Sequence, residues 1–387
     1  MIRLFGRLFA PDDRGLSLVT VEDGRVISID PANGPTADCL GSPEMAILPG
    51  LIDVQVNGAF GLDFSDPNTD MDLVSRGLPQ FGVTSFVPTV VTSPLDAYGP
   101  VLANLRRAPK PGAAHILGAH IEGPFLSPRH PGTHDPALLR NPSVDVAAGW
   151  LTAGDVRIVT IAPELPGSEA LIAYLTTRGV VVSMGHSDAT WDEARTGAAA
   201  GIRFGTHIFN AMRPLRHRDP GLVGYLLESH LPVGFIGDGN HLAFETIALL
   251  ARIKGPDELV LITDALAGLG MPPGPFRLAG REYISDGNCG RLPDGTLSGS
   301  LLPLHRALRN LVEAAGIAPA VAVRMATLNP ARLLDLDGSI GRLEVGRGAD
   351  LVLVDEHWTP VVTLVDGAIA WRLRSGRGSV DEDRRAS

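Results

Sequence analysis

The sequence has few cysteines and no long apolar run. Of its 387 residues, only Cys39 and Cys289 are cysteines, far too few for a secreted fold held by disulfides, and their spacing fits no metal-binding pair. No segment has the roughly 20 consecutive apolar residues that span a bilayer. Residues 1–10 carry arginines among apolar residues and therefore do not resemble a signal peptide. These absences predict a protein of a reducing compartment, the cytoplasm, with no membrane contact.

Positive charge is also scarce. Thirty-three Lys and Arg residues face 43 Asp and Glu, which gives a formal net charge of −10. No basic run is long enough to follow a phosphate backbone, so the composition excludes nucleic acid as a partner. Hydrophobic residues make up 44% of the chain, enough to bury a large core.

The middle of the chain repeats one pattern, in which short apolar runs alternate with helical periodicity, as in parallel βα units. Clear helical patterns cover residues 168–178, 190–200 and 242–254. Eight repeats over this length predict a (β/α)8 barrel, which typically has about 250 residues. The eight apolar runs are residues 46–56, 84–90, 116–121, 156–161, 180–184, 202–207, 233–236 and 259–263.

The two ends of the chain have a different sequence pattern. Both contain short strand-like runs separated by Asp-Gly pairs, which are hairpin signals. We therefore expect residues 1–48 and 341–375 to form one small β-sandwich domain, and residues 49–340 the catalytic barrel. Residues 376–387 are charged and small, and we expect a disordered tail there.

Polar residues stand at the carboxyl ends of six of the eight apolar runs. In a barrel all these ends meet at one mouth, where catalytic groups lie. Residues scattered along the sequence are thus predicted to form a single site. The six segments are Asp53 to Gly58, His120 to Pro124, Met184 to Ser187, Thr206 to Asn210, Gly237 to His241 and Ile262 to Ala265.

Three of these residues fit a metal site of the hydrolytic type. Glu122, His186 and His207 offer a carboxylate and two imidazoles, a common ligand set that leaves one position open for water. Such a metal lowers the pKa of its water from about 15.7 to about 7, which gives a nucleophile near neutral pH. Asp264, at the end of the eighth run, is placed to take the proton of that water and pass it to a leaving amine.

Each of these residues also has a structural explanation. A single histidine at a strand end is more often a hydrogen-bonded structural residue than a ligand, and Asp264 could cap a following helix. The combination of four such groups at strand ends favours the metal site. We interpret Asp53 and Asp63 as structural because no histidine accompanies them. Histidines away from strand ends are expected to be solvated or packed; they are His115, His217, His230, His305 and His357, with His130 left open.

Five motifs, in order, carry a resemblance that covers nearly the whole chain. They are Pro49 to Gly58, His120 to Phe125, Gly185 to Ala189, Thr206 to Met212 and Thr263 to Ala265, and Gly346 to Val352 resembles a family return into a small β domain. With these motifs the chain resembles the N-acetylglucosamine-6-phosphate deacetylases, a branch of the metal-dependent amidohydrolases.

The resemblance implies roles for individual residues. Glu122, His186 and His207 would bind one divalent metal, with Zn2+ expected and Fe2+ or another divalent ion as alternatives, and Asp264 would be the proton shuttle. A homodimer is also implied, in which Arg218 reaches the sugar phosphate across the subunit interface. The implied substrate contacts are Thr133, His134, Asn210, Ala211, Arg218, Asp238, Gly239, Asn240, His241, Leu297, Ser298 and Gly299.

Two features depart from a common amidohydrolase pattern. Many members begin the first strand with His-x-His and bridge two metals through a modified lysine, but here the matching positions are Gln55 and Asn57. The only lysines, Lys110 and Lys254, lie at no predicted strand end, so a single metal is expected. The loop after the sixth run carries three arginines, and which of Arg213, Arg216 and Arg218 holds the phosphate stays open, although the Arg-Asp-Pro-Gly context favours Arg218.

The resemblance implies hydrolysis of the acetamide of N-acetylglucosamine 6-phosphate, and His134 or His241 would polarise the carbonyl oxygen. The phosphate takes no part in bond breaking, so its binding serves to position the acetamide, and arginine suits that task. The alternatives are the galacto epimer, which differs at one hydroxyl, hydrolysis of a cyclic amide, and an inactive barrel that senses a sugar phosphate. The intact set of Glu122, His186, His207 and Asp264 argues against the sensor.

Overall fold

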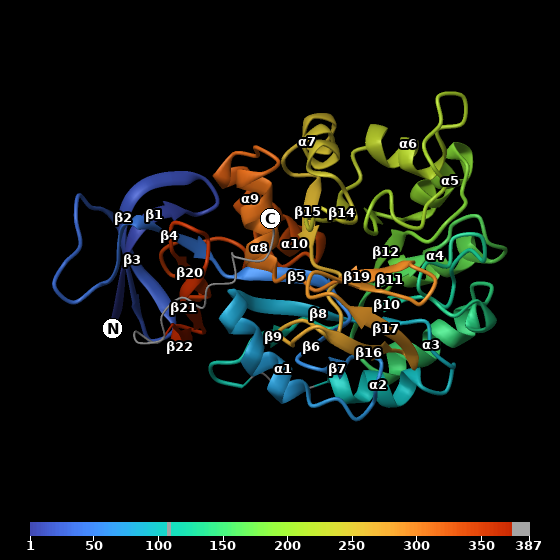
Figure 1. Cartoon of the computed structure of the whole chain (residues 1–387), viewed down its shortest axis with the longest axis horizontal. Helices are drawn as coiled ribbons and strands as arrows, with labels where there is room; N and C mark the ends of the chain where they lie inside the picture. Colours follow the sequence, from blue (N-terminus) through green and yellow to red (C-terminus); the bar gives the residue numbers. More distant parts are fainter. Residues whose placement is uncertain (107–109, 374–387) are drawn as a thin grey trace.

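The central element is a barrel of parallel strands, seen in a computed structural model that describes residues 1–106 and 110–373 (Figure 1). Its strands neighbour one another in the order β5, β8, β10, β11, β12, β13, β14 and β15, and β9 pairs with the start of β8. An isolated parallel bridge between Val56 and Ala265 joins the first strand to the last and closes the ring. The (β/α)8 barrel predicted from the sequence is confirmed. The strands span Leu51–Val56 (β5), Val83–Val91 (β8), His115–Ile116 (β9), Ala119–Glu122 (β10), Val156–Ile161 (β11), Val181–Met184 (β12), Phe204–Gly205 (β13), Val233–Ile236 (β14) and Leu259–Ile262 (β15).

Helices surround the barrel and pack their apolar faces on it. The helix at residues 191–200 begins with a capping box, in which Thr190 and Glu193 satisfy each other's backbone N–H groups. Ser143 and Asp70 cap two other helices in a similar way. The helices are Met71–Gly77 (α1), Tyr98–Leu105 (α2), Val144–Ala153 (α3), Ser168–Thr176 (α4), Trp191–Ala200 (α5), Gly221–Glu228 (α6), Phe244–Ile253 (α7), Leu304–Glu313 (α8), Pro319–Met325 (α9) and Leu328–Leu333 (α10), with short 3-10 turns at Leu78–Phe81 and Pro136–Leu138.

The barrel interior is apolar at one end and polar at the other. Ile52, Val87 and Phe204 form an inner core with Leu333 and Leu334, so the end of α10 fills the lower part of the barrel. The upper part contains His120, whose Nε2 lies 2.7 Å from the hydroxyl of Thr160. The polar end of the barrel therefore stands on a filled core and not on an open channel.

The two ends of the chain form a second sheet of seven strands, at the left of the barrel in Figure 1. Its order is β22, β21, β20, β4, β1, β2 and β3, and all neighbours are antiparallel except β1 and β4. The sheet curls around its own apolar core, because Val26 of β3 exchanges backbone hydrogen bonds with residues 346 and 347, just before β20. The strands are Ile2–Phe9 (β1), Asp13–Glu22 (β2), Arg25–Pro31 (β3), Leu40–Pro49 (β4), Leu351–Val354 (β20), Pro360–Val365 (β21) and Ala368–Arg372 (β22).

The apolar run at residues 46–56 belongs to both sheets. It divides at Gly50, so that its first part ends β4 of the small sheet and its second part is barrel strand β5. A side chain at Gly50 would meet the hydroxyl of Thr84 at 2.1 Å, so the crossing requires glycine. The domain limits at 48/49 and 340/341 stay a prediction, and the tail predicted for residues 376–387 lies outside the described residues.

The segment between β15 and α8 was not anticipated as a unit. It forms an antiparallel sheet with the strands Gly274–Leu278 (β16), Arg281–Ser285 (β17), Cys289–Arg291 (β18) and Leu297–Ser300 (β19). Its last strand bonds to the end of β15, since the N–H of Ser300 donates to the carbonyl of Asp264. A small hairpin of Gly58–Ala59 (β6) and Leu62–Asp63 (β7) follows β5. Within the described residues, no helix is both long and apolar enough to cross a membrane.

Candidate active site

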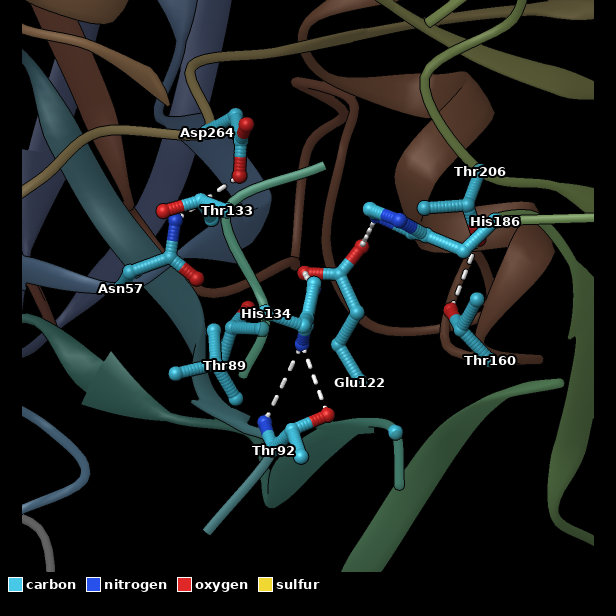
Figure 2. Close-up of polar contacts among 12 residues, drawn as sticks. Asn57, Thr89, Thr92, Glu122, Thr133, His134, Thr160, His186, Thr206 and Asp264 are labelled. Atoms are coloured by element: carbon cyan, nitrogen blue, oxygen red, sulfur yellow. Dashed lines mark hydrogen bonds and ion pairs between the residues drawn. The ribbon is translucent and has the colours of Figure 1, made fainter. Parts of the chain in front are cut away.

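The candidate site is a hollow of about 440 Å³ at the carboxyl ends of the barrel strands. Glu122 and His186 turn toward each other there, and Asn57 turns toward Asp264 (Figure 2). The predicted site residues that line the hollow are Glu122, Thr133, His134, His186, His207, Asn210, Ala211, His241, Asp264, Leu297 and Ser298. Those that do not are Arg218, Asp238, Gly239, Asn240 and Gly299.

Glu122, His186 and His207 bring three donor atoms together. Oε1 of Glu122 lies 2.9 Å from Nε2 of His207 and 3.4 Å from Nε2 of His186, and the two Nε2 atoms are 3.1 Å apart. All three residues are buried. For metal–ligand bonds of about 2.0–2.1 Å, tetrahedral geometry requires ligand atoms about 3.3–3.4 Å apart, so the spacing suits a zinc-sized ion.

The hydrogen bonds of the two histidines also fit a cation. Nδ1 of His186 must carry a proton, because it lies 3.1 Å from the carbonyl oxygen of His130 and a carbonyl only accepts. Its Nε2 therefore presents a lone pair toward His207 and Glu122. Nδ1 of His207 is buried without a partner among the described residues. Although burial opposes it, the hydrogen bond with His207 and the proximity of both histidines hold the pKa of Glu122 well below its usual range, so the group is an anion.

Asp264 follows β15 and is held by two amides. Its Oδ1 accepts hydrogen bonds from Nδ2 of Asn57 at 2.8 Å and from Nε2 of Gln55 at 3.3 Å. Gln55 also donates to Glu122 at 3.0 Å and so links the two carboxylates. Burial and the charge of Glu122 raise the pKa of Asp264 to about 6. The first strand, which was predicted to lack metal ligands, instead supplies amide donors that orient the carboxylates.

His134 has its tautomer fixed by Thr92. Its Nδ1 accepts from the backbone N–H of Thr92 at 3.3 Å and lies 2.8 Å from the Thr92 hydroxyl (Figure 2). Since a backbone N–H can only donate, the proton of the neutral ring sits on Nε2. That atom lies 4.0 Å from Oε2 of Glu122. Burial and the neighbouring His186 lower the pKa of His134 to about 3, so the ring is a neutral donor toward the hollow.

His241 has the opposite arrangement. Its Nδ1 donates to Oδ2 of Asp238 at 2.7 Å, which leaves a lone pair on Nε2 when the ring is neutral. Asp238 also accepts from the backbone N–H groups of Asn240 and His241, both at 2.8 Å. Against the effect of burial, these bonds lower the pKa of Asp238. Asp238 and Asn240 thus fix the turn that presents His241, and they do not line the hollow themselves.

A layer of hydroxyl groups lies beneath the candidate metal-binding residues. The hydroxyl of Thr160 lies 2.7 Å from that of Thr206, the residue before His207 (Figure 2). Thr160 also bonds to His120, whose pKa burial lowers to about 4, so that ring is neutral. The strand ends that carry Glu122 and His207 are therefore tied together by buried hydrogen bonds, which restrict their movement.

The antiparallel sheet after β15 forms one wall of the hollow. Leu297 and Ser298 of β19 line it, and the hydroxyl of Ser298 lies 3.1 Å from that of Thr133 on the opposite loop. Gly299 lies behind them, and a Cβ there would meet the carbonyl oxygen of Asp264 at 2.5 Å. Glycine is needed at this point because the strand passes so close to the backbone of Asp264.

The three arginines of the loop after β13 differ in their contacts and exposure. Arg213 bonds to Asp219 at 2.8 Å and to the carbonyl of Asp188 at 3.2 Å. Arg216 and Arg218 are exposed, and Arg218 does not line the hollow of its own chain. The arginine that does line it is Arg129, which pairs with Asp188 at 2.7 Å. Sequence reasoning missed Arg129, which follows the Glu122 motif on a loop without any regular spacing.

Comparison with known proteins agrees with this geometry. The amidohydrolase family model matches residues 46–372. The N-acetylglucosamine-6-phosphate deacetylase of Bos taurus is 40% identical over 347 residues, which cover 86% of this chain and 85% of that protein. The N-acetylgalactosamine-6-phosphate deacetylase of Escherichia coli O157:H7 is 35% identical over 341 residues, which cover 87% of this chain and 89% of that one.

A solved structure extends the likeness to the fold. A mutant N-acetyl-D-glucosamine-6-phosphate deacetylase from Mycobacterium smegmatis, in complex with N-acetyl-D-glucosamine-6-phosphate, superposes with a TM-score of 0.89 at 31% identity. The match covers 95% of this chain and 99% of that one. The chain therefore belongs to the amidohydrolases, a metal-dependent family of hydrolases. Within them it belongs to the N-acetylglucosamine-6-phosphate deacetylase family, which confirms the resemblance found in the sequence.

Proposed function

We propose that this protein hydrolyses the acetamide of N-acetylglucosamine 6-phosphate to glucosamine 6-phosphate and acetate. The observation that carries the proposal is the buried triangle of Glu122, His186 and His207 beside Asp264, in a chain 40% identical to a deacetylase of that name. The substrate in the related Mycobacterium smegmatis structure is the same phosphorylated sugar.

One divalent ion per chain is proposed at Glu122, His186 and His207, with zinc favoured by the two imidazoles and the carboxylate and Fe2+ as the alternative. A divalent ion bound there supplies Lewis-acid chemistry, because it makes a water molecule acidic near neutral pH and polarises a carbonyl group. Lys254 lies at the end of α7 and bonds to Leu226, remote from the mouth, so we propose a single ion at the mouth and no lysine bridge there.

The residues around the ion have separate roles in proton transfer and hydrogen bonding. The second carboxylate oxygen of Asp264 is not engaged by Asn57 or Gln55, so it is placed to take a proton from water and return it to the leaving amine. Nε2–H of His134 would donate to the acetamide oxygen as negative charge develops on it. Nε2 of His241 would accept a hydrogen bond from a sugar hydroxyl. The two histidines, equivalent in the sequence argument, thus receive different roles.

The sugar would lie between the two walls of the hollow. Leu297 and Ser298 line the hollow from β19, and Thr133, Asn210 and Ala211 line it from loops, so each is proposed to contact substrate. Gly239, Asn240 and Gly299 would act by shaping the backbone behind these contacts.

For the phosphate we propose Arg218 of a second subunit, in a homodimer. Arg213 is already engaged by Asp219 and Asp188, whereas Arg218 is exposed on a loop and does not line the hollow of its own chain. An exposed guanidinium suits bidentate binding of a phosphate presented by a partner. We also propose a cytoplasmic location, because both cysteines are free thiols and the substrate is a phosphorylated metabolite.

The test is release of free amine from N-acetylglucosamine 6-phosphate by protein of known metal content, before and after chelation. Rapid turnover that is lost on chelation and restored by about one equivalent of zinc is expected. Absence of turnover by the metal-loaded protein would refute the proposed activity. The unphosphorylated sugar is the control, and it should react far more slowly because the phosphate positions the acetamide.

The galacto epimer is the second candidate substrate. It is favoured by one observation, the 35% identity to a protein named N-acetylgalactosamine-6-phosphate deacetylase. We favour the gluco substrate because the identity to its deacetylases is higher. Comparison of kcat/KM for the two phosphorylated epimers decides between them.

A further inference from the structure

A second hollow, of about 610 Å³, lies at the opposite end of the barrel, where the barrel meets the small sheet. Ile52 and Leu117 line it from the barrel, and Asp350 and Asp366 line it from the small sheet. The carboxyl ends of the strands, with the catalytic mouth, lie at the other end of the same strands. Nothing in the proposed deacetylation uses this hollow.

Three metal-binding side chains converge in it. Nε2 of His115 lies 3.4 Å from Oδ1 of Asp366 and 3.8 Å from Oδ2 of Asp350, and the three atoms all lie within 4.8 Å of one another. His115 opens barrel strand β9, whereas Asp350 precedes β20 and Asp366 lies in the turn between β21 and β22. The donors therefore come from both parts of the molecule.

The carboxylates are already oriented toward one point. Oδ1 of Asp350 accepts the backbone N–H of Asp366 at 2.7 Å, which leaves Oδ2 facing His115. The turn carrying Asp366 is packed against a second turn, because a Cβ at Gly367 would meet Cα of Gly24 at 2.5 Å. The geometry is thus fixed by backbone contacts and does not depend on the mobile ends of long side chains.

The negative charge of the cluster is not balanced by the arginines nearby. Arg25 and Arg342 line the same hollow, but Arg25 donates to the carbonyl of Gly346 at 2.7 Å. Arg342 pairs with Asp337 at 3.2 Å and with Glu344 at 3.7 Å. Within the described part of the chain, neither arginine forms an ion pair with Asp350 or Asp366, and His115 is the basic side chain that faces both carboxylates. Two carboxylates so close together favour a cation between them.

A buried hydroxyl points to a ligand independently of the charged groups. Ser85 is 1% exposed, lines the same hollow, and its Oγ has no hydrogen-bond partner within the described part of the chain. It pairs with His115 across the sheet, and it shares the inner face of β8 with Val87, two residues further on. A buried polar atom of this kind normally has a partner, and water held by a cation in the hollow would provide one.

We propose that His115, Asp350 and Asp366 bind a divalent transition-metal ion of the zinc class, which links the small sheet to the barrel. A tetrahedral ion with bonds of about 2.0–2.1 Å places its ligand atoms about 3.3–3.4 Å apart, close to the two distances from His115. The imidazole selects zinc, cobalt or nickel over calcium and magnesium, which prefer oxygen ligands. The role of this ion is structural, because the proposed catalytic residues lie at the other end of the barrel.

The test counts metal ions in the full-length enzyme. The protein is dialysed against zinc in excess, washed with zinc-free buffer, and its zinc content per chain is measured for the wild type, His115→Gln and Asp366→Asn. We expect about two ions per chain in the wild type and about one in each variant, with amine release unchanged in both. His357→Gln, at an exposed histidine in the turn between β20 and β21, is the matched control and should keep two ions.

Thermal unfolding gives the second readout. Raising zinc from one to two equivalents should raise the unfolding midpoint of the wild type by about 2 °C or more, and should not raise that of His115→Gln. One ion per chain in the wild type, or two in His115→Gln and Asp366→Asn, would overturn the proposal. Loss of deacetylase activity in all proteins, with the second ion still dependent on His115, would refute the proposed function alone.

Discussion

At the scale of single residues, the two carboxylates of the mouth are suited to different tasks because they have different partners. Glu122 is hydrogen-bonded to His207, lies close to His186, and stays an anion. Asp264 is bound through one oxygen only, by Asn57 and Gln55, and its raised pKa brings it near the range in which a proton can be both taken and returned. The first is suited to hold a cation and the second to move a proton.

Asp264→Asn tests this division. The amide keeps the size of the carboxylate but cannot take a proton, so amine release should fall by about 10²–10⁴-fold while zinc content stays at the wild-type level. Zinc analysis and turnover of the same preparation check it. A variant that keeps more than about a tenth of the wild-type kcat would remove Asp264 from proton transfer.

The two cysteines should differ in reactivity. Cys289 is 1% exposed, and burial raises the pKa of its thiol to about 11, so at pH 8 it is protonated and inert. Cys39 is only half-buried. A thiol reagent at pH 8 should therefore modify one cysteine of the native protein, identified as Cys39 by peptide mapping. After unfolding, both should react, and labelling of native Cys289 at a similar rate would contradict its buried state.

At the scale of elements, regular repeats were predictable and irregular insertions were not. The eight barrel strands follow from apolar runs, because strands buried on both faces must be apolar along their whole length. The sheet of β16–β19 was not predicted. Its strands are short and their buried and exposed residues alternate, so that their sequence resembles that of loops. The run at 46–56 divides between two sheets at Gly50, where local sequence gives no sign of the change in partners.

The candidate site shows the same limit. Strand ends located Glu122, His186, His207 and Asp264, because a barrel brings those ends together whatever lies between them. The partner of each histidine depends on distant loops, so the contact of Thr92 with His134 could not be read from spacing. The position of the arginine loop relative to a second subunit is likewise not encoded in any local pattern.

Gly299→Ala tests how β19 supports the site. Its Cβ would meet the carbonyl oxygen of Asp264 at 2.5 Å, so β19 must move away and carry Ser298 with it. Gly274→Ala is the matched control, because Gly274 has a similar φ (158° against 150°) but no atom within 4 Å of the new Cβ.

We expect Gly299→Ala to lose at least about tenfold in kcat/KM, since small displacements at a catalytic site can cost up to about 10²-fold. Gly274→Ala should stay close to wild type. Steady-state kinetics of both variants on the phosphorylated sugar, together with their unfolding midpoints, check the prediction. Equal losses in the two would show that the backbone angle matters and the contact with Asp264 does not.

At the scale of the whole molecule, the overall negative charge of one chain does not account for the binding of an anionic substrate. The net charge is −10, which repels an anionic substrate at long range. Arg129 lines the hollow and Arg213 follows β13 on a loop, but both arginines pair with the carboxylate of Asp188. An exposed Arg218 brought by a second subunit would supply positive charge that is not already neutralised, which is why we propose a dimeric active unit.

Mixing two inactive variants tests that arrangement. Asp264→Asn removes the proton carrier from its own site, whereas Arg218→Ala should remove the phosphate contact from the site of its partner. A mixed dimer then holds one site with both defects and one intact site. Random exchange of subunits makes half of the dimers mixed, so about a quarter of the wild-type activity should return. Amine release from co-expressed variants measures it, with each variant alone as the control. If Arg218 instead served its own subunit, every site of every mixed dimer would lack one of the two groups, and no activity would return.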